Sequence, residues 1–447
     1  MRGGIVSDVK VSKLRALTFS QRCVLSAVAL SPFQWALTVN VGFPLKLSEI
    51  LLMIGIASYF LFPRVVQPRS LPGKIVTWMG VLLVVSTIAA SFFPSPPGPL
   101  RGFTRSLGVD LWMYCGYGLL ILLAWFPLRS LPRDVFGKAL VVTAWITGIA
   151  SLFQLVMVEL GQNALLHAVN FATEGTGNSL FSGDAGTRSG PFLEGQHLGF
   201  FAGALAIVCL GRKAWFGMVW CLWASLYSQS TTALIGLVVA AGIAIVFRLS
   251  FRAIMATGVG TIAAAFAVQV FPAAREFTTF QLAKLGLFGF DNNYDFATLS
   301  MDLRDVKTTI AFQMMGDYPA TGVGPGRFGA YFFDYPLSNE LPNYYYTSDH
   351  RAIAENAYAQ VAAESGVIML GLLVILLAVL FWRNQTAHVS VFALVGYIGV
   401  GILTQSSWTF IPIWVLIAYA STASTPRARL KTAARSDVAA GTGHPLL

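Results

Sequence analysis

The residues best suited to chemistry in this 447-residue chain lie in and beside one polar insertion, residues 272–352, in an otherwise hydrophobic sequence. The insertion contains Arg304 and Arg327, and Glu355 follows shortly after it. Arginine binds phosphate oxygens through its planar fork of donors, and a carboxylate can remove a proton from a hydroxyl group. Because these residues gather in one loop, we expect chemistry on a phosphate-bearing substrate at a membrane surface.

A second candidate lies near the middle of the chain, where Arg188 precedes Pro191. Proline suits the first turn of a helix, so we expect Arg188 just before the outer end of a membrane span and Glu194 in that span's first turn. For arginines outside the membrane, the alternative to phosphate binding is contact with lipid headgroups or ion pairing with nearby acids. These arginines are Arg101, Arg105, Arg188, Arg275, Arg304, Arg327 and Arg351.

Two carboxylates and two histidines are candidates for a general base. Glu194 and Glu355 fall at expected outer helix starts, where either could remove the proton of an acceptor hydroxyl. An acidic residue also stabilises a helix N-terminus without any catalysis, so capping is the alternative for both. His350 and His197 are further base candidates, although a lone histidine is more often structural.

Glycines and aromatic residues give the insertion two further features. In residues 322–329, Gly-Val-Gly-Pro-Gly-Arg-Phe-Gly, backbone N–H groups could approach an anion, or the glycines could form a tight structural turn. Tyr318 and Tyr345 belong to a group of aromatic residues that could stack on sugar rings. A belt of aromatic residues at the membrane interface explains them equally well, so both alternatives are open.

The rest of the chain must hold these residues at a membrane. Hydrophobic residues make up 55% of the sequence and charged residues only 11%, whereas about a quarter of the residues of a soluble domain are charged. A span needs about 20 apolar residues, and we place about twelve such segments along the chain. The expected fold is an all-α polytopic membrane protein with one large outer loop that contains short helices.

The distribution of the 30 Lys and Arg residues orients the bundle. Short loops rich in these residues face the cytoplasm, which predicts that both termini are cytoplasmic and that the large loop lies outside. The expected parts are a basic tail (1–21), about nine spans (22–271), the outer loop (272–352), three spans (353–422) and a disordered tail (423–447). The net charge of +10 then reflects topology and anionic lipids rather than nucleic acid binding.

Apolar spacing predicts helices on both sides of the candidate residues. Inside the loop, apolar residues recur at intervals of three and four residues, which indicates one face of a short helix that ends near residues 316–319. These apolar residues are Leu303, Val306, Ile310 and Met314. A second helix should begin near Ile353 and continue without a break into the tenth expected span, residues 356–382. Glu355, Asn356 and Gln360 should lie in its outer turns.

Other classes of site find little support in the sequence. No cluster of His and Cys has metal-ligand spacing, so we expect a site that uses no metal ion or other cofactor. The four cysteines lie in apolar segments, where a free thiol behaves as a small hydrophobic group. Ionisable residues are sparse inside the expected spans, which disfavours a transporter or flippase of a lipid-linked or anionic solute.

Three motifs, in this order, resemble the bacterial O-antigen ligase and polymerase superfamily. The first is Arg188-Ser-Gly-Pro-Phe before a span. The second is Arg304 followed by Met315-Gly-Asp-Tyr-Pro-Ala-Thr-Gly-Val-Gly-Pro-Gly-Arg-Phe. The third is Glu355-Asn-Ala-Tyr-Ala-Gln-Val-Ala-Ala-Glu-Ser-Gly366, in which Glu355 stands where the family usually has a histidine.

The resemblance implies a metal-independent glycosyltransferase in the bacterial inner (cytoplasmic) membrane. Such an enzyme takes a glycan from undecaprenyl diphosphate at the periplasmic face and transfers it to an acceptor hydroxyl. Arg188 and Arg304 match the family arginines that hold the diphosphate, and we add Arg327 to them. Glu355 or His350 would then replace the family histidine as the base.

The resemblance also bears on the sugars and on the product. Tyr318, Tyr345, Asn356 and Tyr358 are the residues that we expect to contact sugars. Two products are open: a polysaccharide repeat-unit polymerase, with a chain-length regulator as a further partner, or a ligase that uses lipid A-core as acceptor. The missing histidine and Phe192-Leu-Glu194 after Arg188 favour a polymerase, because they resemble exopolysaccharide polymerases more closely.

Overall fold

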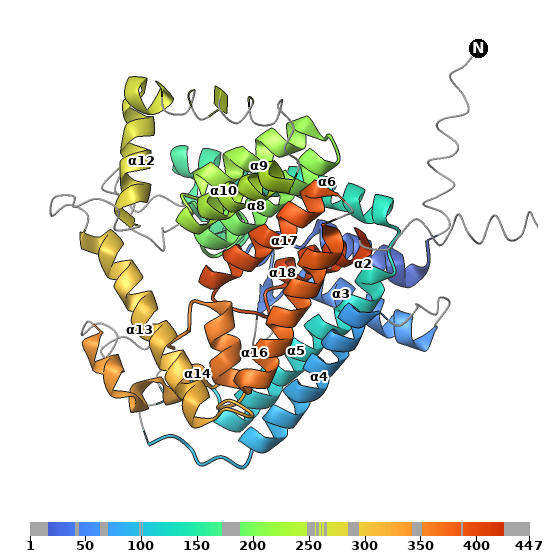
Figure 1. Cartoon of the computed structure of the whole chain (residues 1–447), viewed down its shortest axis with the longest axis vertical. Helices are drawn as coiled ribbons and strands as arrows, with labels where there is room; N and C mark the ends of the chain where they lie inside the picture. The colour runs from blue at the N-terminus through green and yellow to red at the C-terminus, as the bar shows by residue number, and fades with distance from the viewer. Residues whose placement is uncertain are drawn as a thin grey trace, which may run out of the picture.

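The computed structural model describes residues 17–40, 44–62, 70–97, 100, 102–171, 188–247, 255, 259–260, 262, 266–284, 295–341, 351–385 and 388–423. The described chain is almost entirely helical (Figure 1), as its composition predicts. Strand structure in it consists of the short antiparallel pair β1 (Val39–Asn40) and β2 (Pro44–Leu45). The expected all-α class is therefore confirmed apart from this pair.

Helices occur along the whole described chain. In its first half they are α2 (Phe19–Ala29), α3 (Leu47–Leu61), α4 (Leu71–Ala90), α5 (Leu107–Arg129), α6 (Arg133–Glu159), α7 (Asn163–Ala168), α8 (Gly195–Gly211), α9 (Trp215–Tyr227) and α10 (Thr231–Phe247). In the second half they are α12 (Pro272–Lys284), α13 (Asp295–Asp317), α14 (Phe328–Tyr331), α16 (Ala357–Asn384), α17 (Val389–Gly401) and α18 (Ile411–Ala423). The 3-10 helices η2 (Phe332–Asp334), η3 (Pro336–Glu340) and η4 (Ile402–Thr404) also lie in the second half.

Four helices among the described residues are long and apolar enough to cross a membrane: α4, α5, α6 and α16. Shorter apolar helices pack with them. The predicted first span, 22–40, is helical only as far as Ala29, because Pro32 follows and the residue before a proline disfavours helical backbone. About half of the ninth predicted span, 253–271, lies outside the described residues. The count of about twelve spans and the orientation therefore stay predictions.

The starts of α4 and α5 show why the long helices begin where they do. The hydroxyl of Ser70 accepts the backbone N–H of Gly73 at 3.2 Å, and Pro72 occupies the first turn of α4. In the same way the hydroxyl of Ser106 accepts the N–H of Val109 at 3.4 Å. Each serine satisfies a backbone donor that has no partner within its helix. Polar caps thus set the ends of otherwise uniformly apolar segments.

Helix α13 carries the predicted apolar face but is longer than the short helix expected, because it continues upstream to Asp295. Ile310 and Met314 are fully buried, and they pack against Phe328 and Ala359 in a second hydrophobic cluster that we call the loop core. In Figure 1, α13 lies at the side of the bundle, and it packs against α16. The outer insertion therefore has its own core, joined to the bundle through α16.

Helix α16 is broken at Gly366, contrary to the expectation of a straight helix. Gly366 has φ +78°, a left-handed conformation that a side chain disfavours. The break releases the carbonyl groups of Ala363 and Glu364, which accept the N–H groups of Val323 at 2.8 Å and Gly324 at 3.1 Å. The glycine-rich loop is thus joined to the break in α16 by backbone hydrogen bonds.

Gly322 shows why this loop needs glycine. Its φ is +63°, and a Cβ atom placed there would lie 2.4 Å from the backbone carbon of Glu364. The side chain of Glu364 also accepts the N–H of Phe328 at 3.4 Å. The loop N–H groups that could have faced an anion are therefore used within the fold, so the geometry supports a structural turn.

Candidate functional site

Arg304 and Lys307 lie one turn apart on α13 and bind the same carboxylate, that of Glu355. The Nε atom of Arg304 is 3.0 Å from Oε2 of Glu355, and Nζ of Lys307 contacts Oε1. The Lys307 side chain is 3% exposed, whereas those of Glu355 and Arg304 are 20% and 30% exposed. One carboxylate between two cations leaves a surplus of positive charge. We call these three residues the cation cluster.

The backbone around Glu355 differs from the prediction. Helix α16 begins at Ala357, and Asn356 caps it by accepting the N–H groups of Tyr358 at 3.0 Å and Ala359 at 3.2 Å. Glu355 stands before the cap with φ +52°. The expectation that Glu355 lies in an outer turn was therefore wrong, and capping does not explain it. Its left-handed backbone instead directs the carboxylate to α13.

The electrostatics of Glu355 follow from its position. Burial raises the pKa of its carboxyl group, but the charges of Lys307 and Arg304 and their hydrogen bonds outweigh burial, so the pKa lies below the usual value. Glu355 is ionised at neutral pH. A carboxylate held in this way is a weak proton acceptor while both cations remain bound to it.

The cation cluster continues onto the first turn of α8. Nη2 of Arg304 donates to Oε1 of Gln196 at 2.8 Å, and Nε2 of Gln196 donates to Oε2 of Glu194 at 2.6 Å. Glu194 occupies the position just before α8 rather than its first turn. Three residues singled out in the sequence, Arg304, Glu355 and Glu194, thus form one network linked by Gln196.

Arg188 lies beside the same helix start. Its Nη1 donates to Oε1 of Gln229 at 2.8 Å, and its Cγ atom lies 3.2 Å from where a Cβ atom of Gly195 would stand. Burial lowers the pKa of the Arg188 guanidinium. Pro191 precedes α8 instead of lying in its first turn, and its carbonyl group accepts the N–H groups of Trp35 at 3.2 Å and Ala36 at 3.3 Å. Arg188 therefore lies just ahead of the helix, as predicted.

The structure places Arg327 elsewhere, in the loop core. Its Nη1 donates to the carbonyl group of Ala90 at 2.6 Å, at the C-terminal end of α4, and the residue is only 6% exposed. A cation at that end is favourable because the helix dipole is negative there. These contacts give Arg327 a structural function, while binding of diphosphate by it stays a prediction.

The residues expected to contact sugars lie in different settings. The side-chain oxygen of Asn356 serves as the cap of α16, and the hydroxyl of Tyr358 donates to the carbonyl group of Gly399 at 2.9 Å. The ring of Tyr318 packs against Phe93 and Tyr331, with ring centres 5.3 and 5.9 Å away. Tyr345, and with it the candidate base His350, lies outside the described residues.

Two members of the site were not selected from the sequence. Lys307 follows Arg304 by three residues on the predicted helix, and this spacing is the signal that both side chains could reach one ligand. Gln196 gave no signal, because a single glutamine in an apolar helix is not distinctive. Only the approach of α13 to α8 shows its part in the network.

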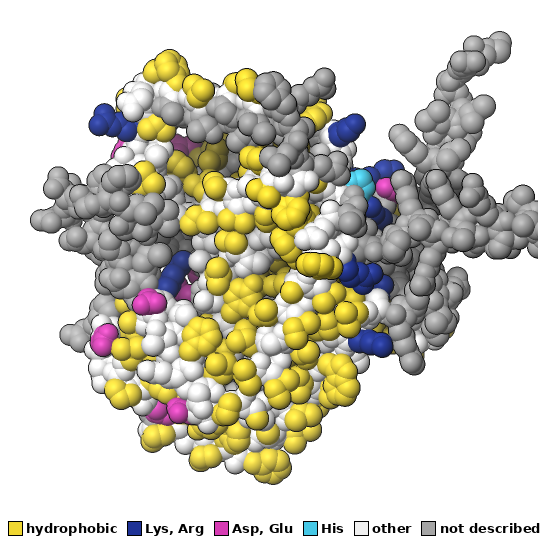
Figure 2. All heavy atoms as spheres, in the orientation of Figure 1, with side chains coloured by type: hydrophobic (Ala, Val, Ile, Leu, Met, Phe, Trp, Pro, Cys, Tyr) yellow, Lys and Arg dark blue, Asp and Glu magenta, His cyan; other side chains and the backbone are white. Residues whose placement is uncertain are grey.

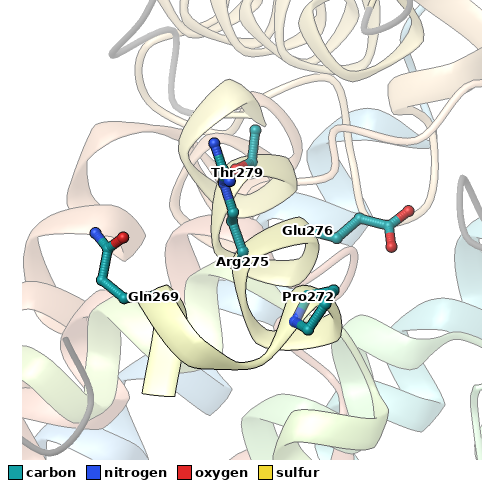
Figure 3. A pocket seen from close by; sticks show the side chains of 5 residues that line it. All are labelled: Gln269, Pro272, Arg275, Glu276 and Thr279. Atoms are coloured by element: carbon teal, nitrogen blue, oxygen red, sulfur yellow. The ribbon is translucent and has the colours of Figure 1, made fainter. Parts of the chain in front are cut away.

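A pocket outside this network and possible metal ligands are the other candidate features of the described residues. An open pocket of about 300 Å³ lies along α12 and the residues before it (Figure 3), lined by Gln269, Pro272, Arg275, Glu276 and Thr279. No residue of the cation cluster lines it. Over the described ranges, no group of three or more His, Cys, Asp and Glu side chains is placed to hold a metal ion.

The comparison with known proteins bears on the region that carries the cation cluster. Residues 216–374 match the model of a family described as O-antigen ligase. This region extends from α9 through α13 and the glycine-rich loop to the first part of α16. The resemblance to the O-antigen ligase and polymerase superfamily is thereby confirmed. No curated protein matches the chain.

The family match and the apolar helices together indicate a membrane protein similar to enzymes of the O-antigen ligase and polymerase type. On the face seen in Figure 2, apolar side chains cover the region of α4, α5 and α16, and charged side chains gather near α13. A surface of this kind suits contact with lipid on one side and a polar substrate on the other.

Proposed function

We propose that this protein transfers a glycan from undecaprenyl diphosphate to an acceptor hydroxyl at the periplasmic face of the inner membrane. The observation that carries the proposal is the cation cluster. Arg304 and Lys307 share one carboxylate, and Arg304 is also bound to Gln196 at the start of α8. Arg188 lies beside the same helix start with its guanidinium on Gln229, and we propose it as a third cation of this site.

A diphosphate suits this position because of its charge and its geometry. Its oxygen atoms would compete with the Glu355 carboxylate for Arg304 and Lys307, and a guanidinium group binds two such oxygens at once. When the bond between the sugar and the diphosphate breaks, negative charge grows on the departing phosphate. Cations that are already in place stabilise that charge without reorganisation.

Glu355 has a positioning role in this proposal. In the ligand-free state its ion pairs hold Arg304 and Lys307 in position, and its lowered pKa makes it a weak base. Once a diphosphate takes over the cations, burial alone acts on the carboxyl group and raises its pKa. Proton transfer by Glu355 is the alternative, and it depends on this displacement by the donor. Catalysis by His350 stays a proposal from the sequence.

Two acceptors fit the same donor site. A second lipid-linked glycan would make the protein a repeat-unit polymerase, and the Phe192-Leu-Glu194 sequence after Arg188 favours this product. A lipid A-core acceptor would make it a ligase, which the description of the matching family favours. We propose the polymerase first, with membrane lipids and a chain-length regulator as further partners.

The test is a reaction in vitro with the purified full-length protein in detergent. It receives undecaprenyl diphosphate-linked repeat units, with and without lipid A-core. A ladder of longer lipid-linked glycans without added core supports the polymerase, and product only with the core supports the ligase. If neither product forms but the lipid-linked units cross the bilayer of reconstituted vesicles, the protein is a transporter and the proposal is wrong.

A further inference from the structure

His197 follows Gln196 in the first turn of α8, with a carboxylate at ion-pair distance from one ring nitrogen and a hydroxyl group at hydrogen-bond distance from the other. Its Nδ1 lies 3.8 Å from Oε2 of Glu194, and its Nε2 lies 3.1 Å from Oγ of Ser406. The imidazole ring also packs against Phe410, with ring centres 4.9 Å apart. A carboxylate, an imidazole and a hydroxyl therefore stand in line.

This line begins at the proposed diphosphate site. Gln196 and His197 are consecutive, and Gln196 is bound to Arg304. His197, which would accept a proton, thus directly follows Gln196, which is bound to Arg304, the cation that would hold the leaving group.

The far end of the line lies in a buried irregular segment between η4 and α18. Ser406 belongs to it, and the N–H of Trp408 donates to Oε1 of Gln360 on α16 at 3.1 Å. Gln405 is fully buried, and within the described parts of the chain neither polar atom of its side chain has a hydrogen-bond partner. A buried amide without a protein partner is rare, and a polar guest would satisfy its hydrogen-bonding groups.

We propose that His197 is the general base of the transfer reaction and that Glu194 orients its imidazole. The acceptor hydroxyl would lie beside Ser406, on the Nε2 side of the ring. This inference rests on the proposed function. An imidazole whose one nitrogen faces a carboxylate and whose other faces a hydroxyl is the arrangement that activates oxygen nucleophiles in many enzymes. Neither of its nitrogens is held by a cation, in contrast to the carboxylate of Glu355.

The transfer step exchanges one bond at the anomeric carbon for another. The acceptor oxygen forms a bond to that carbon while the bond from the carbon to the diphosphate oxygen breaks. The acceptor proton moves to Nε2 of His197, either directly or through the hydroxyl of Ser406. The diphosphate leaves with the bonding electron pair, held by Arg304 and Lys307, and the Glu194 carboxylate stabilises the imidazolium until its proton returns to water.

The deciding variant is His197→Gln, because glutamine can keep a hydrogen bond to Ser406 but accepts no proton. Turnover of undecaprenyl diphosphate-linked repeat units should fall by about 100-fold or more. Binding of undecaprenyl diphosphate without sugar, followed by tryptophan fluorescence, should stay within about twofold of wild type, because the cations that bind the diphosphate are unchanged. His167→Gln on α7 is the matched control, and it should leave both quantities unchanged.

A second variant separates catalysis from folding. His197→Ala should regain about tenfold or more of its lost turnover in added imidazole, because a free base can then occupy the vacated position. Wild-type turnover in His197→Gln overturns the inference. So does a loss of turnover that imidazole does not restore, since His197 is then structural. If the wild-type protein itself forms no product and binds no undecaprenyl diphosphate, the proposed function fails instead.

Discussion

Two arginine and glutamate sets in this protein resemble each other in the sequence but differ in what they bind. Arg304 and Glu355 are partly exposed and bind each other, and their further partners are also side chains, those of Gln196 and the buried Lys307. Arg327 and Glu364 are almost fully buried, and they bind backbone groups: the carbonyl group of Ala90 and the N–H of Phe328.

The difference separates a residue that builds the fold from one that is available to a substrate. A side chain bound to backbone in the interior is replaced only by disturbing that backbone. An ion pair between partly exposed side chains can exchange partners with an incoming anion at small cost. The cation cluster is therefore the diphosphate site that we propose, whereas the N–H groups of the glycine-rich loop are already used within the fold.

The largest expected effect on activity comes from Arg304→Ala. Turnover in the lipid-linked repeat-unit assay should fall by about 100- to 1,000-fold, because the developing phosphate charge loses one stabilising cation. Membrane insertion and melting temperature should stay close to wild type. Arg275→Ala on α12 is the matched control. Equal activity of Arg304→Ala and wild type would show that Arg304 does not stabilise the departing phosphate.

The largest expected effect on stability comes from Gly366→Ala at the break in α16. A side chain there meets the carbonyl oxygen of Pro319 at 2.5 Å and disfavours the observed φ of +78°. The left-handed conformation alone costs about 1–2 kcal/mol, so the melting temperature should fall. Gly371→Ala on the same helix has open space and should be neutral or stabilising. Similar melting temperatures for the two variants would show that the break is not required.

Glu355→Gln and Glu364→Gln test whether the first carboxylate serves the reaction and the second serves the fold. Glu355→Gln should lower turnover by about tenfold, and it should also lower the melting temperature because the buried Lys307 loses its carboxylate partner. Glu364→Gln should chiefly lower the melting temperature. If Glu355 is the base after all, Glu355→Gln loses about 100-fold or more and Glu355→His retains far more activity. The reverse pattern between the two positions would contradict the comparison.

The smallest effect is a pH dependence of stability. The pKa of Glu355 is lowered in the folded protein, so its contribution is present above its unfolded pKa of about 4.3 and is lost as the pH falls through the lower folded value. The difference in melting temperature between wild type and Glu355→Gln should therefore shrink between about pH 5 and pH 3. A constant difference would show that the ion pairs with Arg304 and Lys307 add nothing.

Part of the site follows from local sequence. The spacing of Ile310 and Met314 predicted the buried face of α13. It also placed Arg304 at the N-terminal end of that helix, whereas the helix begins nine residues earlier, at Asp295. The proline near α8 placed Arg188 just before that helix. The start of α16 was predicted too early in the chain, since Asn356 and not an earlier residue provides the cap. Local rules locate a helix better than they locate its first residue.

Other parts required contacts between distant segments. The choice between an anion-binding loop and a structural turn depended on the carbonyl groups of Ala363 and Glu364, which the break in α16 makes available to Val323 and Gly324. No property of the loop sequence alone reveals that its N–H groups are already used. The same holds for His197 and Ser406, which meet only because α8 lies against the segment before α18.

The sequence by itself determined that the chain is a helical membrane protein and that its polar chemistry lies in and around one insertion, because hydrophobicity and helix periodicity are local properties. Its motifs also supplied the resemblance to the O-antigen ligase and polymerase superfamily. The tertiary structure alone decided that Arg304 and Lys307 share the Glu355 carboxylate, whereas Arg327 serves the fold. The physical reason is that a charge acquires its function from its partner, and these partners come from helices far apart in the sequence.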